Sequence, residues 1–140
     1  MVSYELRLVD IHLLKPHEMI NKERLEELEK EIKEDRILKK PIVADRSTLV
    51  VLDGHHRLEV LRKMGAKRIP VILVDYDDPR IIVKKWRENG DLEKNLVREA
   101  GIYGKLFPPK TSKHMVLFNE ELKHIEVLQK RVDIKLEKLV

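Results

Sequence analysis

The sequence predicts an α/β fold of the α+β kind, in which a small mixed sheet is flanked by helices and a helical appendage follows toward the C-terminus. Two observations predict it. Short β-branched runs alternate with segments of helical periodicity in the order strand, helix, strand, strand, helix, strand. The length of 140 residues suits one domain with a small addition. We therefore expect a first domain at residues 1–77 and a segment at residues 78–140 that completes a cleft.

The first domain begins with a strand, a loop and a helix. Apolar residues within 6–9 predict the strand, and Lys15-Pro16 interrupts it because proline restricts the residue before it. The loop that follows carries His17-Glu18. Asn21 is a good N-cap, and apolar residues at i, i+3 and i+7 predict a helix from there to about Asp35.

The second half of this domain contains the segment of greatest chemical interest. Residues 41–44 and 48–52 are short β-branched runs that predict two strands joined by a tight connection. The second run leads directly into Asp53-Gly54. A helix closed by Gly65 follows, and residues 69–74 return as another strand.

The C-terminal segment has weaker patterns. Asp77-Asp78-Pro79 offers a helix start, and the spacing of apolar residues predicts a helix that carries Trp86. Residues 87–107 are weakly patterned and interrupted by glycines. Asn119 is expected to cap a last helix, and residues 132–136 alternate like a strand, although the pattern does not assign the final eight residues.

Composition limits the classes of function. The chain has no cysteine, which excludes disulfides, thiolate zinc sites and cysteine nucleophiles. No stretch approaches the roughly 20 apolar residues that span a bilayer, and the N-terminus lacks a secretory h-region, so we expect a cytoplasmic protein with no membrane partner. The net charge of +4 is spread among interleaved acids and bases, which does not require a nucleic acid partner. Charged residues at 39% with a single glutamine resemble thermophile surfaces.

The junction Asp53-Gly54-His55-His56-Arg57 predicts a phosphate-binding turn. A strand that runs through a glycine into a helix start leaves several backbone N–H groups unpaired, and the helix dipole attracts an anion there. Arg57 can donate two parallel hydrogen bonds to phosphate, and the dipole is expected to keep both histidines neutral until phosphate binds. The alternative is a turn without a ligand. Metal binding by two adjacent histidines is less favoured.

From Leu13 to Val74, about half of the chain, the order of elements and the Asp53–Arg57 turn resemble the ParB/sulfiredoxin superfamily. Sulfiredoxin chemistry needs a cysteine, which this chain lacks. The remaining residues offer no clear helix-turn-helix of the kind that follows this domain in chromosome-partition ParB proteins. The chain is more similar to the free L-serine kinases related to ParB, which use ADP or ATP. The segments that carry this resemblance are His17-Glu18, the Asp53–Arg57 turn, Trp86 and the Pro108–His114 loop.

That resemblance implies roles for individual residues. Glu18 would be the general base and Asp53 a catalytic residue and Mg²⁺ ligand. The nucleotide phosphates would be held by Gly54, His55, His56, Arg57, Lys110, Thr111 and Ser112, and the substrate by Trp86, Lys113 and His114. Two departures concern the serine pocket: residues 87–107 are shorter than in those kinases, and Lys113 stands where arginine is usual.

Each residue also has an alternative role without a ligand. Glu18 would be a solvated loop acid, Trp86 a core anchor and Pro108–His114 a surface turn. The expected ligands are L-serine, ADP or ATP, and Mg²⁺, with the protein a monomer or homodimer. The rival functions are a ParB-like nucleotide-binding module associated with DNA and a sensor that binds nucleotide without turnover.

Overall fold

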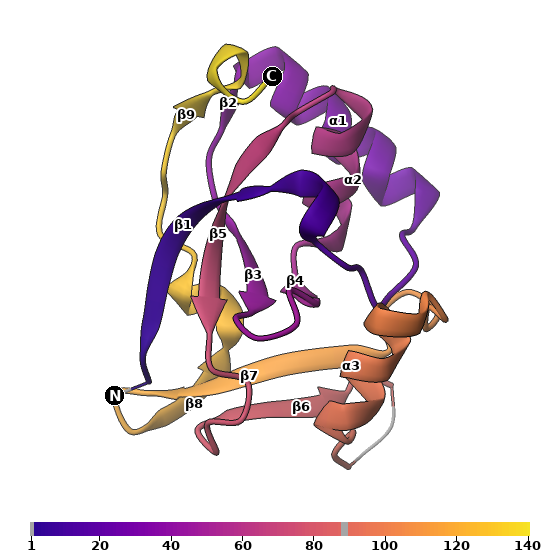
Figure 1. Ribbon diagram of the computed structural model, residues 1–140, viewed down its shortest axis with the longest axis vertical. Helices are drawn as coiled ribbons and strands as arrows, with labels where there is room; N and C mark the ends of the chain where they lie inside the picture. Colours follow the sequence, from indigo (N-terminus) through magenta and orange to yellow (C-terminus); the bar gives the residue numbers. More distant parts are fainter. Residues whose placement is uncertain (1, 88–89) are drawn as a thin grey trace.

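The computed structural model describes residues 2–87 and 90–140, and its first layer is a four-stranded mixed sheet. The strand order is β1-β5-β3-β4, with β1 and β5 antiparallel, β5 and β3 parallel, and β3 and β4 antiparallel (Figure 1). These strands are β1 (Tyr4–Asp10), β3 (Ile42–Asp45), β4 (Val51–Asp53) and β5 (Arg68–Val74). The predicted small mixed sheet is therefore confirmed.

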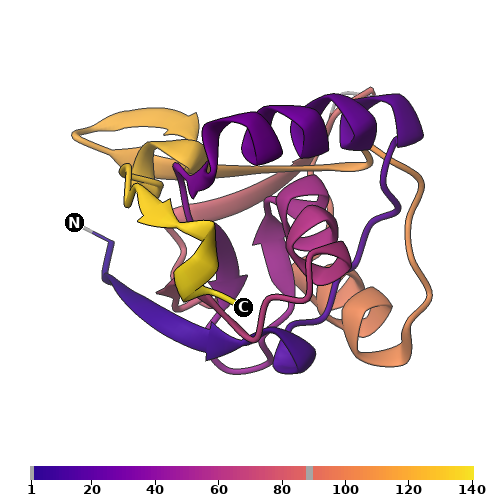
Figure 2. The same ribbon diagram turned by 90° about the horizontal axis from the view of Figure 1, so that it is seen from above.

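Two helices of this first unit lie beside each other (Figure 2). Helix α1 (Lys22–Asp35) starts after Asn21, whose Oδ1 accepts a hydrogen bond from the backbone N–H of Arg24. Helix α2 (His55–Lys63) starts after Gly54. Both helices fall where capping residues and periodicity predicted them.

The C-terminal half is mainly a second sheet, so the prediction of a helical appendage is wrong in its detail. Strands β6 (Ile81–Lys85), β7 (Ser112–Phe118) and β8 (Glu121–His124) form an antiparallel sheet in sequence order across one end of the first layer (Figure 1). One helix, α3 (Lys94–Tyr103), lies between β6 and β7 in the sequence. The remaining short elements are β2 (Ile37–Leu38) paired with β9 (Ile134–Lys135), and the 3₁₀ turns η1 (Ile11–Leu13), η2 (Ile125–Leu128) and η3 (Leu136–Lys138).

The prediction of a helix that starts after Asp77-Asp78-Pro79 and carries Trp86 is wrong, because residues 81–85 form β6. Ile81 and Val83 alternate with less buried neighbours, the period of a strand, and β7 supplies the hydrogen-bond partners. The predicted cap at Asn119 is also wrong. Asn119 and Glu120 have φ values of 51° and 64°, which makes them the tight turn between β7 and β8.

Helix α3 was missed because two glycines dilute its pattern. Gly101 faces the core, where an added Cβ would come within 2.7 Å of a Val50 methyl group. Gly104 ends the helix in a left-handed conformation with φ 69°. Residues 88 and 89 of the weakly patterned segment lie outside the described residues.

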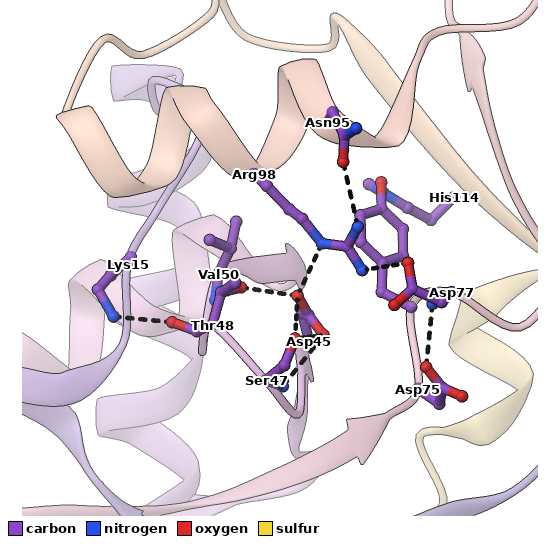
Figure 3. Close-up of polar contacts among 11 residues, drawn as sticks. Lys15, Asp45, Ser47, Thr48, Val50, Asp75, Asp77, Asn95, Arg98 and His114 are labelled. Atoms are coloured by element: carbon purple, nitrogen blue, oxygen red, sulfur yellow. Dashed lines mark hydrogen bonds and ion pairs between the residues drawn. The ribbon is translucent and has the colours of Figure 1, made fainter.

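The C-terminal half is tied to the first unit by a polar cluster. Nε of Arg98 on α3 donates to Asp45 Oδ2 at 3.2 Å, and its Nη2 donates to Asp77 at 2.9 Å (Figure 3). The hydroxyls of Ser47 and Thr48 also donate to Asp45, which is 1% exposed. One buried hydrophobic cluster combines strands of both halves. In the described part of the chain, no helix has the length and apolar character needed to cross a bilayer.

Candidate active site

A loop before α1 carries His17 and Glu18, and backbone pairing fixes it on both sides. The N–H of Val51 donates to the carbonyl oxygen of Lys15 at 2.8 Å, which ties the loop to β4. The N–H of Met19 donates to the carbonyl oxygen of Phe107, and the N–H of Phe107 donates to that of His17. The loop therefore spans the two halves of the molecule.

The carboxylate of Glu18 is held by the loop that precedes β7. Its Oε1 accepts the N–H of Lys110 at 2.6 Å, and its Oε2 accepts the N–H of Ser112 at 3.1 Å and the Ser112 hydroxyl at 2.7 Å. Lys110 has a left-handed φ of 57°, which turns the loop around the carboxylate. The side chain of Glu18 is 11% exposed, so it is not the solvated acid of the alternative interpretation.

The start of α2 requires glycine. Gly54 has φ 101°, and an added Cβ would lie 2.6 Å from a methyl carbon of Ile42. The N–H groups of the first helical turn have no partner within the helix, which suits an anion. Nη1 of Arg57 donates to the carbonyl oxygen of Pro41 at 2.8 Å, which fixes the guanidinium beside the turn.

The two adjacent histidines accept hydrogen bonds from the loop before α1. The N–H of His17 donates to His55 Nε2 at 3.1 Å, and the N–H of Asn21 donates to His56 Nε2 at 2.8 Å. Each ring therefore carries its hydrogen on Nδ1 when it is neutral. Burial lowers the pKa of both rings, with neighbouring positive groups adding to the effect. The expected neutral state is supported, with burial rather than the helix dipole as its leading cause.

Asp53 contacts the C-terminal segment. Gln129 Nε2 donates to Asp53 Oδ2 at 2.7 Å, and His124 Nε2 lies 3.9 Å from Oδ1. Burial raises the pKa of Asp53, an effect partly offset by His124 and Gln129. Among the described residues, no group of three or more His, Cys, Asp or Glu side chains could hold a metal ion. The donor set fits Mg²⁺ only as an ion carried on phosphates and completed by one carboxylate and water.

These groups face one cleft of about 580 Å³. Ten of the twelve residues predicted for the site line it: Glu18, Asp53, Gly54, His55, His56, Arg57, Trp86, Lys110, Ser112 and His114. Trp86 is 43% exposed, so the interpretation of this residue as a core anchor is wrong. The turn and the late loop, more than fifty residues apart in sequence, thus share a single concave surface.

The structure does not bring two of the predicted residues into the cleft lining. The hydroxyl of Thr111 donates to the carbonyl oxygen of Pro108 at 2.7 Å, within its own loop. The ammonium of Lys113 lies 4.8 Å from the centre of the Trp86 ring, in a cation–π contact. Ser112 does line the cleft, but its hydroxyl is bonded to Glu18.

Sequence reasoning missed several lining residues. Arg24 and Glu27 come from α1, and His124 comes from the end of β8. His17 is fully buried behind Glu18, with Nδ1 2.6 Å from the carbonyl oxygen of Val51 and Nε2 2.7 Å from Ser112 Oγ. The only sequence signal for a role of His17 was its position next to Glu18. Its hydrogen-bond partners, Val51 and Ser112, are distant in sequence, and no local pattern predicts them.

Comparison with known proteins gives consistent matches. The family model for the ParB N-terminal domain matches residues 2–90. An ATP-dependent L-serine kinase of Staphylothermus marinus is 34% identical over 83 residues, which are 56% of this chain and 33% of that protein. An ADP-dependent L-serine kinase of Thermococcus kodakarensis is 31% identical over 96 residues, which are 64% of this chain and 40% of that protein. Each alignment thus spans well under half of the relative's length.

A solved structure of a free serine kinase in complex with AMP matches with a TM-score of 0.80. The match covers 99% of this chain and 94% of the other, at 18% sequence identity. At this identity the likeness shows the fold, and it extends over the second sheet as well as the first.

Proposed function

The chain belongs to the ParB N-terminal domain family, and we propose that it is a kinase that transfers a phosphoryl group from ADP or ATP to the hydroxyl of free L-serine. The observation that carries the proposal is the shared cleft, in which the Glu18 carboxylate and the start of α2 face the same space. A general base and an anion-binding helix start in one cleft are two parts that phosphoryl transfer needs. The names of the curated relatives supply the acceptor and the donors.

The start of α2 is the phosphate end of the proposed site. Backbone N–H groups after Gly54 would donate to phosphate oxygens, and Arg57 would add charge with the nitrogens not bonded to Pro41. His55 and His56 use Nε2 to accept backbone hydrogens, which leaves Nδ1–H as their donor. Both are thus suited to donate as neutral rings, without a proton taken up when phosphate binds.

Glu18 is the proposed general base, and its hydrogen bonds indicate which oxygen acts. A carboxylate has about four lone-pair positions. Oε2 accepts two donors from Ser112, whereas Oε1 accepts one from Lys110. The remaining position on Oε1 would receive the serine hydroxyl proton while the three donors hold the carboxylate still.

The acceptor pocket would be formed by residues of the C-terminal half that line or adjoin the cleft. Trp86 and Lys110 line the cleft, and the Lys113 ammonium, 4.8 Å from the centre of the Trp86 ring, would attract the substrate carboxylate. His114 also lines the cleft, and its Nε2 lies 2.8 Å from the Tyr76 hydroxyl. Asp53 would complete the coordination of Mg²⁺ brought by the nucleotide, and the ion would neutralise charge on the phosphates.

Turnover is the direct test. The protein is mixed with Mg²⁺, L-serine and either ADP or ATP, and we expect O-phosphoserine together with AMP or ADP, respectively. Absence of phosphoserine with both donors, while calorimetry shows nucleotide binding, would reject the kinase in favour of a nucleotide-binding module.

Two variants separate the proposed roles. Glu18→Gln is expected to reduce turnover by about 10²-fold or more with ADP affinity retained, because it removes only the base. Arg57→Met is expected to weaken ADP binding by about tenfold or more through loss of a charge-assisted contact. Arg68→Met, at an exposed position, is the matched control. Unchanged ADP affinity in Arg57→Met would contradict the phosphate-binding turn.

A further inference from the structure

Three side chains, of which Glu18 and Ser112 line the cleft and His17 is buried beneath them, form a continuous hydrogen-bonded series. His17 Nδ1 lies 2.6 Å from the carbonyl oxygen of Val51, and His17 Nε2 lies 2.7 Å from Ser112 Oγ. Ser112 Oγ in turn lies 2.7 Å from Glu18 Oε2. His17 is 0% exposed and Ser112 is 8% exposed, so water has little access to the series.

The hydrogen bonds among His17, Ser112 and Glu18 depend on where the side-chain hydrogens of His17 and Ser112 lie. A carbonyl oxygen only accepts, so the ring hydrogen of His17 lies on Nδ1 and points at Val51. Burial lowers the pKa of His17 to about 4, so at neutral pH its Nε2 carries no hydrogen. The Ser112 hydroxyl has one hydrogen, and both of its neighbours, His17 Nε2 and the Glu18 carboxylate, are acceptors. Two acceptors therefore compete for a single hydrogen.

We propose that the Ser112 hydroxyl is a two-position switch, which donates to Glu18 while the carboxylate is ionised and turns to His17 once Glu18 has taken up a proton. An ionised carboxylate is the stronger acceptor, whereas a neutral carboxyl group is weaker than an imidazole nitrogen. Ser112 and His17 are thus positioning residues for the base. The inference rests on the proposed function insofar as Glu18 takes its proton from the substrate hydroxyl.

The step balances without a further reactant. The substrate O–H bond breaks as its oxygen bonds to the transferred phosphorus, and the bond from phosphorus to the nucleotide leaving oxygen breaks. The proton goes to Glu18 Oε1. The Ser112 O–H bond rotates and does not break. Backbone N–H groups of Lys110 and Ser112 hold the carboxylate in both states. Because His17 offers Ser112 a second partner, protonation of Glu18 does not strand the hydroxyl.

Other titratable groups lie near His17, Ser112 and Glu18. The His55 and His114 rings lie 4.6 Å and 5.7 Å from the His17 ring, and burial lowers the pKa of both. His56 at the start of α2, Arg24 of α1 and Lys110 line the same cleft as Glu18 and Ser112. These groups are the same in every variant below, so differences between variants report the switch.

Nitrogen NMR of the His17 ring tests the switch without any turnover. We expect a neutral ring with hydrogen on Nδ1, and an upfield shift of Nε2 in Glu18→Gln, where the weaker neutral acceptor releases the hydroxyl to His17. Adding Ser112→Ala to Glu18→Gln should abolish that shift. The proposal would be overturned by a doubly protonated His17 ring at neutral pH. It would also be overturned by an Nε2 chemical shift that stays the same in Glu18→Gln and in the double variant with Ser112→Ala.

The acid limb of the pH profile for kcat/KM tests the consequence for the base. In His17→Leu the hydroxyl donates only to the carboxylate, which favours the ionised form, so the limb moves to lower pH by about one unit. In Ser112→Ala the carboxylate loses that donor, so the limb moves to higher pH. His17→Gln and Ser112→Thr keep acceptor and hydroxyl and should restore the native profile, while the exposed His12→Gln is the matched control.

The turnover assay and the tests of the switch can give negative results independently of each other. If the native protein makes no phosphoserine, the proposed function is rejected and the NMR result alone decides the switch. If the native protein turns over but His17→Leu and Ser112→Ala move the limb in the same direction, or leave it in place, the switch is wrong and the kinase stands. A purely structural role would lower activity in both variants without opposite shifts.

Discussion

The side chain of His17 shows how one buried residue connects stability with pH. It has no exposed surface, and it bonds to a backbone carbonyl on one side and a hydroxyl on the other. Removal from water disfavours the charged ring, which lowers its pKa to about 4 from a usual value of 6.5. The cost of protonation is then linked to folding.

Stability should fall when the protein is acidified. Between pH 6.5 and about 4 the unfolded chain binds a proton at His17 and the folded chain does not, so unfolding gains from acid. The full window corresponds to about 3 kcal/mol from this residue. Denaturant unfolding of the native protein and of His17→Gln at pH 7 and pH 4.5 measures it. The variant should lose less stability on acidification, and equal losses would contradict the assignment.

At the scale of elements, the glycine between β4 and α2 sets the geometry of the proposed phosphate site. Gly54 adopts φ 101° directly against Ile42, and its conformation decides where the first N–H groups of α2 point. The helix that follows was predictable because a left-handed residue, a periodic stripe and a closing glycine are all local features.

Gly54→Ala should destabilise the fold by about 2 kcal/mol or more, since strain at positive φ adds to overlap with Ile42. Gly65→Ala is the matched control, because Gly65 also has positive φ, 77°, but an added Cβ meets nothing within 4 Å. We expect about 1 kcal/mol there. Denaturant unfolding midpoints of the two variants measure these losses of stability. Equal losses in Gly54→Ala and Gly65→Ala would show that the close approach to Ile42 is unimportant.

At the scale of the whole molecule, the proposed base and its support come from opposite halves. Glu18 accepts hydrogen bonds from the backbone N–H groups of Lys110 and Ser112, which follow it by 92 and 94 positions in the sequence. Behind them, the ion pair between Arg98 on α3 and Asp45 at the end of β3 joins the two halves, with 16% and 1% of their side chains exposed (Figure 3). Docking of the second sheet is therefore a condition for assembling the site.

Removing the partner of the buried carboxylate should weaken that docking. Arg98→Met leaves Asp45 buried with its two hydroxyl donors but without a counter-charge, and we expect a loss of about 3 kcal/mol. Asp45→Asn combined with Arg98→Met should cost less than the sum of the single changes. A double-mutant cycle in denaturant measures the coupling. Strictly additive losses would mean that the pair does not join the halves.

The sequence by itself determined the first unit of this protein and ten of the residues that line its cleft. The caps of α1, the glycine before α2 and the order of elements are local signals, and the resemblance carried by the Asp53–Arg57 turn and the late loop named ten residues that do line the cleft. Such signals are readable because they depend on backbone geometry within a few residues.

Only the tertiary structure decided how those residues work together. Residues 81–85 form a strand because β7 pairs with them, although their spacing predicted a helix. Ser112 is hydrogen-bonded to Glu18 and His17, whereas the resemblance assigned it to phosphate, and Thr111 and Lys113 lie outside the cleft lining. The physical reason is common to all of them: strand pairing and side-chain hydrogen bonds join groups far apart in sequence, and no local periodicity encodes the partner.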